Sequence, residues 1–435
     1  MKWFLGAGIL LALSYLLKSD MLAYAMYALL ALLAISRWLS HSWIGHLEAS
    51  RNCNRLTAEI GDLVGIHLEV TNHGKTLVPW VLLEDMLPPR AIQSRPPALA
   101  VEGSHVQLAL VRGGDQKTLR YQLRCKRRGY YQLGPVIMET GDLFGLHRRY
   151  RVTTEPDFLL VYPKVIPLDG YDLASRRPIG EVTMSYRLFE DPTRIRGVRP
   201  FQQGDPLNRI HWHATARTGQ FFSKIYEPTT VAGATLLLEF HSDSYDRANE
   251  PVRSELAITA AASIANAIQQ MGQQVGLLTN GRDAVDRIRQ DGWDPEQRSR
   301  QAARQAVTMH QQSDRLQPLI IETRRDPDQF LRIRETLARV ELTDGLTLSQ
   351  LTSETGSRIP RDATVIAIVP RVDEETVLAL SSLKRRGFAV LAVINLDDEN
   401  EFTDAAGALL VHGIDSMHLA QEESIRTICQ QYSLR

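Results

Sequence analysis

Two long apolar runs at the N-terminus constrain this chain more than any other feature. Residues 3–17 and 21–35 are nearly free of polar side chains, and a short Lys-Ser-Asp break separates them. Each run would form about 22 Å of helix at ~1.5 Å per residue, less than the ~30 Å hydrocarbon core of a bilayer. Trp38 and Trp43 follow the second run and can lie at the membrane interface. The sequence therefore predicts a transmembrane helical hairpin over residues 1–40.

Two other interpretations compete with a membrane hairpin. A secretory signal peptide would use Lys2, the first apolar run and the small-residue site at Ala23 and Ala25. Against it, Lys18 and Asp20 interrupt the apolar core, and the apolar sequence continues well past Ala25. A buried hairpin of a soluble protein would also be apolar, but such helices usually carry polar residues on one face.

The basic residues around the two runs predict an orientation in the membrane. Arg37, Arg51 and Arg55 follow the second run, whereas the break between the runs carries only Lys18 as a basic residue. Because cytoplasmic flanks carry the excess of Lys and Arg, both chain ends and the whole globular part are expected in the cytoplasm. This predicts a double-pass protein of the inner, or cytoplasmic, membrane.

The composition of the 435-residue chain describes an ordinary globular protein behind this tail, with 44% hydrophobic and 23% charged residues. Lys plus Arg and Asp plus Glu number 50 each, so no net charge recruits nucleic acid, and no nucleic-acid partner is expected. The odd number and wide spacing of the cysteines argue against a disulfide framework and favour a reducing compartment. They are Cys53, Cys125 and Cys429.

Residues 48–165 show the alternation of apolar and polar side chains that is typical of antiparallel strands. Val64, Ile66, Leu68 and Val70 alternate with polar or charged residues, and residues 119–125 repeat the pattern. Turn-forming residues separate these runs. The sequence therefore predicts a β-sandwich domain in this region.

The spacing of apolar residues changes in residues 231–435, where apolar runs typical of strands alternate with stripes typical of amphipathic helices. Residues 234–240 form an apolar run, and the next stripe recurs every four residues and ends before Gly272. Strand, helix and strand patterns follow at 363–369, 373–386 and 389–395. This alternation predicts an α/β doubly wound domain with a mostly parallel sheet. Residues 166–230 form a linker segment of weak periodicity.

Within this segment, the stretch RPFQQGDPLNRIHWHATART at residues 199–218 admits two interpretations. One is a metal-dependent hydrolase site built on Asp205, His211 and His213, since two histidines two apart share a face on a strand. Zinc needs a third and a fourth ligand, and no further ligand pair with the usual spacing lies nearby. The other interpretation is a structural clamp, in which Trp212 is buried in an interdomain core.

The strand-rich region also contains a basic segment, residues 120–151. Such a segment is usually the solvated outer face of a one-sided sheet. In a membrane-anchored protein it also allows binding of anionic lipid or of an envelope polymer. Its basic residues are Arg120, Arg124, Lys126, Arg127, Arg128, Arg148, Arg149 and Arg151.

An ordered set of motifs carries a resemblance over nearly the whole chain. They are RRGYYQLGP (127–135), DLFGL (142–146), VYP (161–163), GD (204–205), RIHW (209–212) and AR (216–217). Together they resemble the bacterial domain-of-unknown-function 58 family. The resemblance implies membrane helices, a β-rich segment and a domain similar to von Willebrand factor A. It also implies a membrane-bound adaptor or assembly role, associated with MoxR-type AAA+ ATPases, rather than an enzyme.

The resemblance assigns roles to further residues. The family signature would fix the two domains relative to one another through Arg199, Gly204, Asp205, Arg209, Trp212, Ala216 and Arg217. Some members keep an Asp-x-Ser-x-Ser metal motif, and the matching positions here are Glu239, His241 and Asp243. His241 is a poor substitute for serine as a ligand of a hard cation, so we expect no metal and no cofactor, with a divalent cation as the less favoured alternative.

Partner binding is then expected at the rim formed by the carboxyl ends of the parallel strands, where Asp373 would lie. The sequence thus favours a membrane-anchored, non-enzymatic adaptor that presents an α/β domain to a AAA+ ATPase. The hydrolase and the lipid- or polymer-binding protein stay open as alternatives.

Overall fold

A computed structural model describes residues 6–10, 12, 16, 20–142, 145, 147–168, 190–200, 210–228, 233–285, 316–361 and 363–427. The chain divides into two compact units. Unit 1 comprises residues 1–164, 281–316 and 334–345, and unit 2 comprises residues 165–280, 317–333 and 346–435. The segment that was expected to link the domains therefore groups with unit 2.

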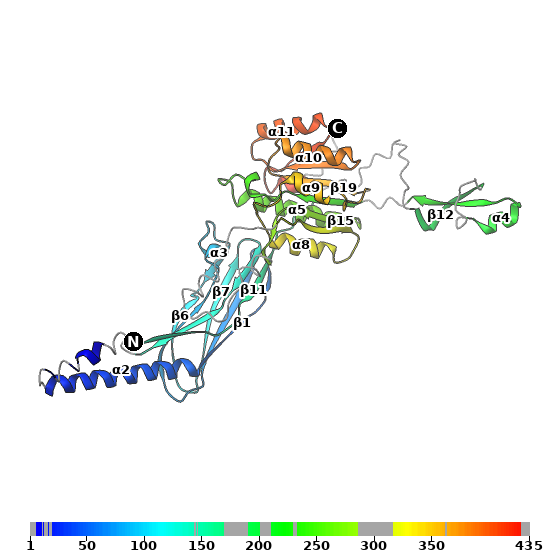
Figure 1. Ribbon diagram of the computed structural model, residues 1–435. Coiled ribbons are helices and arrows are strands. Elements are labelled where there is room, and N and C mark those ends of the chain that lie inside the picture. The colour runs from blue at the N-terminus through cyan, green and yellow to red at the C-terminus, as the bar shows by residue number, and fades with distance from the viewer. Residues whose placement is uncertain are drawn as a thin grey trace. The chain divides into compact units, whose positions relative to one another are not determined.

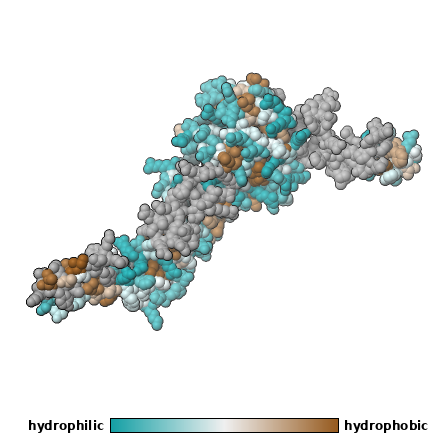
Figure 2. Space-filling view, viewed as in Figure 1, coloured by the Kyte–Doolittle hydropathy of each residue, from teal (hydrophilic) through white to brown (hydrophobic). Residues whose placement is uncertain are grey.

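The second apolar run forms one long helix, α2 (Asp20–His46), in unit 1. It is the single helix among the described residues that is long and apolar enough to cross a membrane. The large side chains of Met21, Tyr24, Ile35 and Trp38 are exposed along it, and Figure 2 shows apolar surface there. A candidate membrane helix is thus confirmed. Residues 6–10 of the first run are helical, and most of the remaining first run lies outside the described residues.

The helix runs beyond the predicted limit at residue 40 and enters the core of unit 1. Trp43, which was expected at the membrane interface, is instead buried, together with Ile44 and Leu47. The expectation for Trp43 was wrong because the last turn of α2 packs its apolar side against the strands. β1 begins directly at Leu47, so helix and first strand are continuous.

Unit 1 is rich in β-structure (Figure 1). One antiparallel sheet has the order β1-β3-β7-β5, a second has the order β10-β9-β4-β6, and β2, β11 and β8 form a third. The strands are β1 (Leu47–Cys53), β2 (Thr57–Glu59), β3 (Leu63–Asn72), β4 (Val78–Asp85), β5 (Leu99–Glu102), β6 (Val106–Val111), β7 (Gln116–Cys125), β8 (Gly129–Leu133), β9 (Val136–Gly141), β10 (Arg148–Val152) and β11 (Asp157–Tyr162), with helix α3 (Pro89–Gln93) after β4.

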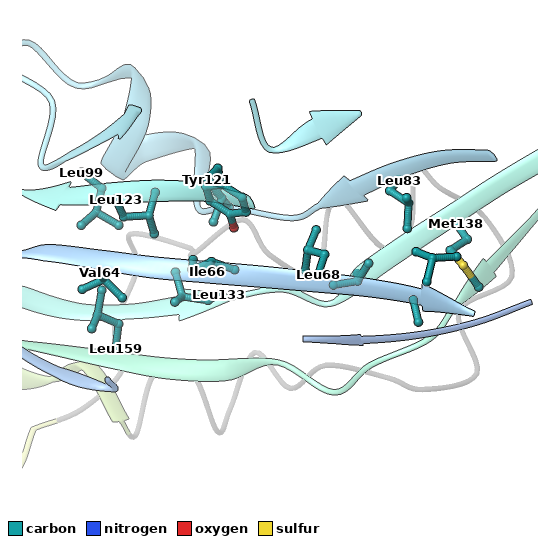
Figure 3. Packing of buried hydrophobic residues seen from close by; sticks show 14 of the residues in the cluster. Val64, Ile66, Leu68, Leu83, Leu99, Tyr121, Leu123, Leu133, Met138 and Leu159 are labelled. Atoms are coloured by element: carbon teal, nitrogen blue, oxygen red, sulfur yellow. The ribbon is translucent and has the colours of Figure 1, made fainter. Parts of the chain in front are cut away.

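The two larger sheets share one apolar core, so the prediction of a β-rich domain is confirmed. The alternating side chains of β3 are buried, and Ile66 and Leu68 lie in one cluster with Leu83 of β4 and Met138 of β9 (Figure 3). The alternation seen in the sequence is therefore the inward face of β3. A short two-stranded sheet, β16 (Arg282–Asp283) and β18 (Val340–Glu341), also belongs to unit 1.

Unit 2 is built on a six-stranded sheet with the order β17-β15-β14-β19-β20-β21. All neighbours are parallel except β17, which is antiparallel to β15. The strands are β14 (Gly233–Leu238), β15 (Gln274–Thr279), β17 (Leu319–Arg324), β19 (Ala363–Val369), β20 (Ala389–Ile394) and β21 (Asp415–His418). The helices are η2 (Ser242–Ser244), α5 (Val252–Gln270), α9 (Leu348–Thr355), α10 (Glu374–Arg385), α11 (Glu399–Val411) and α12 (Ser424–Thr427). Helix α8 (Gln329–Arg339) belongs to unit 2 up to Ile333 and to unit 1 from Arg334.

Helices cover both faces of this sheet. α9, α10 and α11 share an apolar cluster with alternate strand residues such as Leu237 and Ala367. The intervening residues, among them Leu236 and Ile366, point to the other face, where α5 packs on β14, β15 and β19. The helical stripe of α5 is almost wholly buried, and Gly272 follows it with a positive φ, as predicted.

A buried ion pair joins three strands of unit 1. The Arg51 guanidinium of β1 donates to Asp85 of β4 at 3.0 Å and to Asp157 of β11 at 3.0 Å. Asp85 also accepts a 2.7 Å hydrogen bond from the hydroxyl of Tyr121. The side chains of Arg51 and Asp85 are almost fully buried. Removing one partner would leave the other as an uncompensated buried charge.

We therefore expect Arg51→Met to lower the free energy of unfolding by about 3–5 kcal/mol. The matched control is Arg55→Met, because Arg55 pairs with Asp62 on the exposed surface. Losing that pair should cost no more than about 1 kcal/mol. Denaturant unfolding of the purified protein in detergent measures both variants, and equal destabilisation would contradict the importance of the buried pair.

Candidate functional site

The carboxyl ends of β14 and β19 form the switch point of the parallel sheet. The chain leaves β14 toward β15 on one side and leaves β19 toward β20 on the other, so the loops after these two strands diverge. Open α/β sheets bind ligands in the crevice that such divergence creates. The loop after β14 carries Glu239, His241 and Asp243, and the loop after β19 carries Asp373. The structure thus places Asp373, the predicted rim residue, at the same end of the sheet as the three positions of the metal motif.

Glu239 is the chemically most unusual residue at this end of the sheet. Its backbone N–H donates to the carbonyl oxygen of Ile368, and its carboxyl group is buried. One carboxyl oxygen accepts a 2.5 Å hydrogen bond from the hydroxyl of Ser244, while Oε2 is buried and has no hydrogen-bond partner among the described residues. Burial raises the pKa of Glu239 to about 7; the hydrogen bond from Ser244 lowers it, and the nearby carboxylates of Asp373 and Glu375 raise it.

The other two positions of the degenerate metal motif do not join Glu239 in a ligand set. Nδ1 of His241 accepts a hydrogen bond from the backbone N–H of Asp243 at 3.2 Å and so begins the short helix η2. Asp243 itself is exposed on η2. Among the residues that the structure describes, no group of three or more His, Cys, Asp or Glu side chains is placed to hold one metal ion. The arrangement therefore gives a capped loop around one buried carboxyl group.

Asp373 lies at the rim, where it begins α10. Its carboxylate accepts a 2.8 Å hydrogen bond from the backbone N–H of Thr376. Partial burial opposes ionisation, but the hydrogen bonds from Thr376 outweigh it and lower the pKa of Asp373. The neighbouring Glu375 accepts a 2.7 Å hydrogen bond from the hydroxyl of Thr347, the residue that caps α9. The carboxyl groups of Asp373 and Glu375 are thus held in place by the ends of two helices, and the cation Arg371 lies close enough to Asp373 to lower its pKa further.

Two buried asparagines that were not predicted from the sequence hold the rim loops. Asn280 follows β15, accepts from the N–H of Phe240 at 2.6 Å and donates to the carbonyl oxygen of Leu346 at 2.8 Å. Asn395 follows β20 and donates to the carbonyl oxygen of Arg253 at 2.8 Å. The signal in the sequence is an asparagine directly after an apolar strand run.

The family-signature segment forms a two-stranded sheet with a short helix. β12 (Glu190–Pro200) pairs with β13 (Phe222–Pro228), and α4 (Trp212–Thr218) lies between them in the sequence. Gly204, Asp205 and Arg209 lie outside the described residues. Arg199 donates to the carbonyl oxygen of Pro200 at 3.3 Å.

The expectation that Trp212 is buried in an interdomain core was wrong, because 67% of its surface is exposed. α4 contains no buried residue, and Ala216 and Arg217 are exposed as well. Hydrogen bonds, rather than apolar packing, hold this helix against β13. The N–H of His211 donates to the carbonyl oxygen of Phe222 at 2.8 Å, and the N–H of Phe222 donates to the hydroxyl of Thr215 at 3.1 Å.

The two histidines of this segment serve different local purposes. Nδ1 of His211 accepts a 3.0 Å hydrogen bond from the N–H of Ala214 and caps α4. His213 lies inside the helix and is exposed, and the two ring centroids are 6.4 Å apart in an edge-on arrangement. Asp205, the third residue of the hydrolase hypothesis, is not among the described residues. The two histidines are therefore neighbours, and Nδ1 of His211 is already engaged in capping the helix.

The basic segment of unit 1 divides into buried and exposed positions. Arg128 is buried and donates to the carbonyl oxygens of Leu337 at 2.9 Å and Val340 at 2.7 Å, so it does not lie on a solvated face as expected. Leu337 lies in the last turn of α8 and Val340 begins β18 directly after it, so the cation lies at a helix C-terminus, where it is favourable. Arg124 pairs with Glu102 on the surface. The segment is therefore not one continuous basic face.

Residues 197–322 match the model of a family described as "Protein of unknown function DUF58". Among curated proteins, "Uncharacterized protein YeaD" of Bacillus subtilis (strain 168) is 25% identical over 297 residues, which cover 65% of this chain and 71% of the relative. The CARDB domain of PF1109 from Pyrococcus furiosus, solved in complex with di-metal ions, covers 26% of this chain and 91% of that chain at 11% identity and a TM-score of 0.18. PapD-like domain 7 of human CEP192 covers 26% of this chain and 83% of that chain at 16% identity and a TM-score of 0.19.

The pKa of Glu239 predicts a pH-dependent stability. The ordinary pKa of 4.5 rises to about 7 in the folded protein, so the folded state binds the extra proton between these values. The stabilising contribution of Glu239 is fully present below its ordinary pKa of 4.5 and is lost as pH rises through the folded pKa of about 7. At about 1.4 kcal/mol per pKa unit, the free energy of unfolding falls by roughly 3 kcal/mol in total. Glu239→Gln should remove this decline. Unfolding measured across that pH range tests it, and Asp243→Asn, on the exposed helix η2, should keep the decline.

The exposure of Trp212 predicts that its removal leaves folding almost unchanged. Trp212→Ala should alter the free energy of unfolding by no more than about 0.5 kcal/mol, the usual range for an exposed substitution, whereas loss of a buried Trp costs about 3–5 kcal/mol. Trp43→Ala, in the core of unit 1, is the matched control and should show the large effect. A large loss for Trp212→Ala would restore the clamp interpretation.

Proposed function

The family model and the Bacillus relative confirm the resemblance to the family described as protein of unknown function DUF58, and from this premise we propose that the protein is a membrane-anchored, non-enzymatic adaptor. Its α/β unit would present a binding surface in the cytoplasm. The partner proposed from the family resemblance is a AAA+ ATPase of the MoxR type.

The observation that carries the proposal is the apolar surface of α2. Met21 and Tyr24 near its start and Ile35 and Trp38 further along are exposed, although such side chains are costly to leave in water. A hydrocarbon environment removes that cost. The first apolar run is similar in length and composition, so we extend the proposal to a double-pass anchor with both ends in the cytoplasm.

The topology of unit 2 supports a fold similar to von Willebrand factor A. Its sheet is parallel apart from β17, β14 lies at the centre, and helices cover both faces. In such a fold the switch point is the expected contact surface. The acidic rim at Asp373 and Glu375 is then the surface that we assign to the partner. The tight capping roles of Asp373 and His241 favour binding over catalysis, because both side chains already hold the loops.

The proposal is tested by membrane fractionation followed by affinity capture. The full-length chain should stay with membranes after alkaline extraction and should retain a MoxR-type ATPase in the presence of ATP. Glu374 is exposed between Asp373 and Glu375 in the first turn of α10, and Glu374→Arg, which reverses its charge, should reduce capture. Arg385→Glu, at the other end of the same helix α10, should leave it unchanged.

Each outcome bears on a different part of the proposal. A chain that is released from membranes by alkaline extraction contradicts the anchor. Retention of the chain without any ATPase contradicts the assigned partner. Equal capture by both variants contradicts the rim as the contact surface.

A further inference from the structure

Unit 1 brings the β3–β4 connection onto the last turn of α2. The backbone N–H of His73 donates to the carbonyl oxygen of His46 at 2.9 Å. The backbone at Gly74 approaches so closely that an added Cβ would lie 3.1 Å from the Cβ of His46. His73 and Gly74 are therefore held directly against the end of the helix.

Two further connections meet at the same end. The β6–β7 turn joins the β3–β4 turn, since the N–H of Asn72 donates to the carbonyl oxygen of Asp115 at 3.1 Å. A Cβ at Gly113 would lie only 2.5 Å from the carbonyl oxygen of Lys75, so the two turns touch through their backbones. The β9–β10 connection is tied to the beginning of β4 by Trp80, whose indole N–H donates to the carbonyl oxygen of Asp142 at 3.4 Å.

This end of unit 1 exposes basic and apolar side chains together, with two acidic residues, Asp115 and the His73 partner Glu48, beside them. Lys75, Arg112 and Arg148 are exposed, one in or beside each of the three connections, and Leu77 and Leu110 expose nearly half of their surface beside them. Arg148 lies 3.7 Å from Glu139, too far for a strong pair, and is itself mostly exposed. We call these five residues the turn surface. Charged amino and guanidinium groups next to apolar side chains match the chemistry of a bilayer interface.

The turn surface lies close to the point where α2 would leave the membrane. Trp38 is the last large exposed aromatic residue of the helix, and the chain from Trp38 to His46 spans about 12 Å at ~1.5 Å per residue. The headgroup zone extends roughly 5–7 Å beyond the hydrocarbon core on each side, and tilting of the helix shortens the remaining distance. Long Lys and Arg side chains can span the distance that remains between the turns and the headgroups.

We infer that the turn surface contacts the headgroups of anionic phospholipids and so fixes unit 1 against the bilayer. The inference rests on the anchoring by α2 that is proposed above. A lipid surface is favoured over an acidic protein because these turns are bonded to the end of the membrane helix itself. Each basic side chain close to an anionic surface strengthens such contact by about fivefold.

The test uses the full-length protein in nanodiscs of phosphatidylcholine, with or without phosphatidylglycerol. A fluorophore on Leu77→Cys, in a background without the native cysteines, should be quenched by lipids that carry a paramagnetic headgroup. A fluorophore on Ser104→Cys, at the other end of β6, should not. Quenching at Leu77 should increase with phosphatidylglycerol and fall at high salt, because salt screens exposed charges.

Charge reversal with a matched control separates lipid contact from general effects. Lys75→Glu/Arg112→Glu/Arg148→Glu should abolish the dependence on phosphatidylglycerol. Reversal of three exposed residues at the opposite end of unit 1 should preserve it; these are Arg90, Arg95 and Lys126.

The possible failures are distinguishable. A protein that does not enter nanodiscs contradicts the anchor, and with it the proposed function. A protein that enters them while the Leu77 label stays in water, or is quenched equally in both lipids, overturns only the inference about anionic headgroups. If the reversal leaves quenching unchanged but removes capture of the ATPase, the turn surface serves a protein and the inference is wrong.

Discussion

The structure of unit 1 depends on the continuity of α2 with the first strand. Trp43 and Ile44 from the last turns of the helix and Leu47 from β1 are buried in the same core as the sheets. The β3–β4 turn bonds to the helix end through His46. The proposed anchor is therefore not a detachable tail. Its C-terminal turns supply part of the hydrophobic core, so the packing of unit 1 includes the end of the helix that carries the exposed apolar surface.

Much of the fold could be predicted because it follows from local periodicity. The alternation around Ile66 marks a strand with one buried face, and the stripe of α5 with Gly272 after it marks a helix and its end. Asp373 was placed at the rim because it follows the strand that ends at Val369. The same reasoning was wrong for Trp43 and Trp212, because the periodicity of a segment does not determine which distant segment covers a large aromatic side chain.

The candidate site was predicted in its position but not in its chemistry. Residues 239–243 were identified by resemblance to a metal motif, yet the state of Glu239 depends on segments far apart in the sequence. Ser244 bonds to its carboxyl group, and Asp373 approaches it because β14 and β19 are neighbours in the sheet. No local pattern encodes that pairing. The roles of Asn280 and Asn395 likewise require knowing which loops lie beside them.

The exposure of Trp212 changes the interpretation of the family-signature segment. A two-stranded sheet is at best marginally stable by itself, and here the hydrogen bonds of His211 and Thr215 with Phe222 add to its strand pairing. Trp212 contributes little apolar burial to that arrangement. Folding alone thus gives no reason for a large aromatic residue at this position. Tryptophan and arginine are the residues that most often carry binding energy at interfaces, and here Trp212 and Arg217 are both exposed on α4. The exposed Trp212 therefore argues against an internal clamp that depends on burial of its ring.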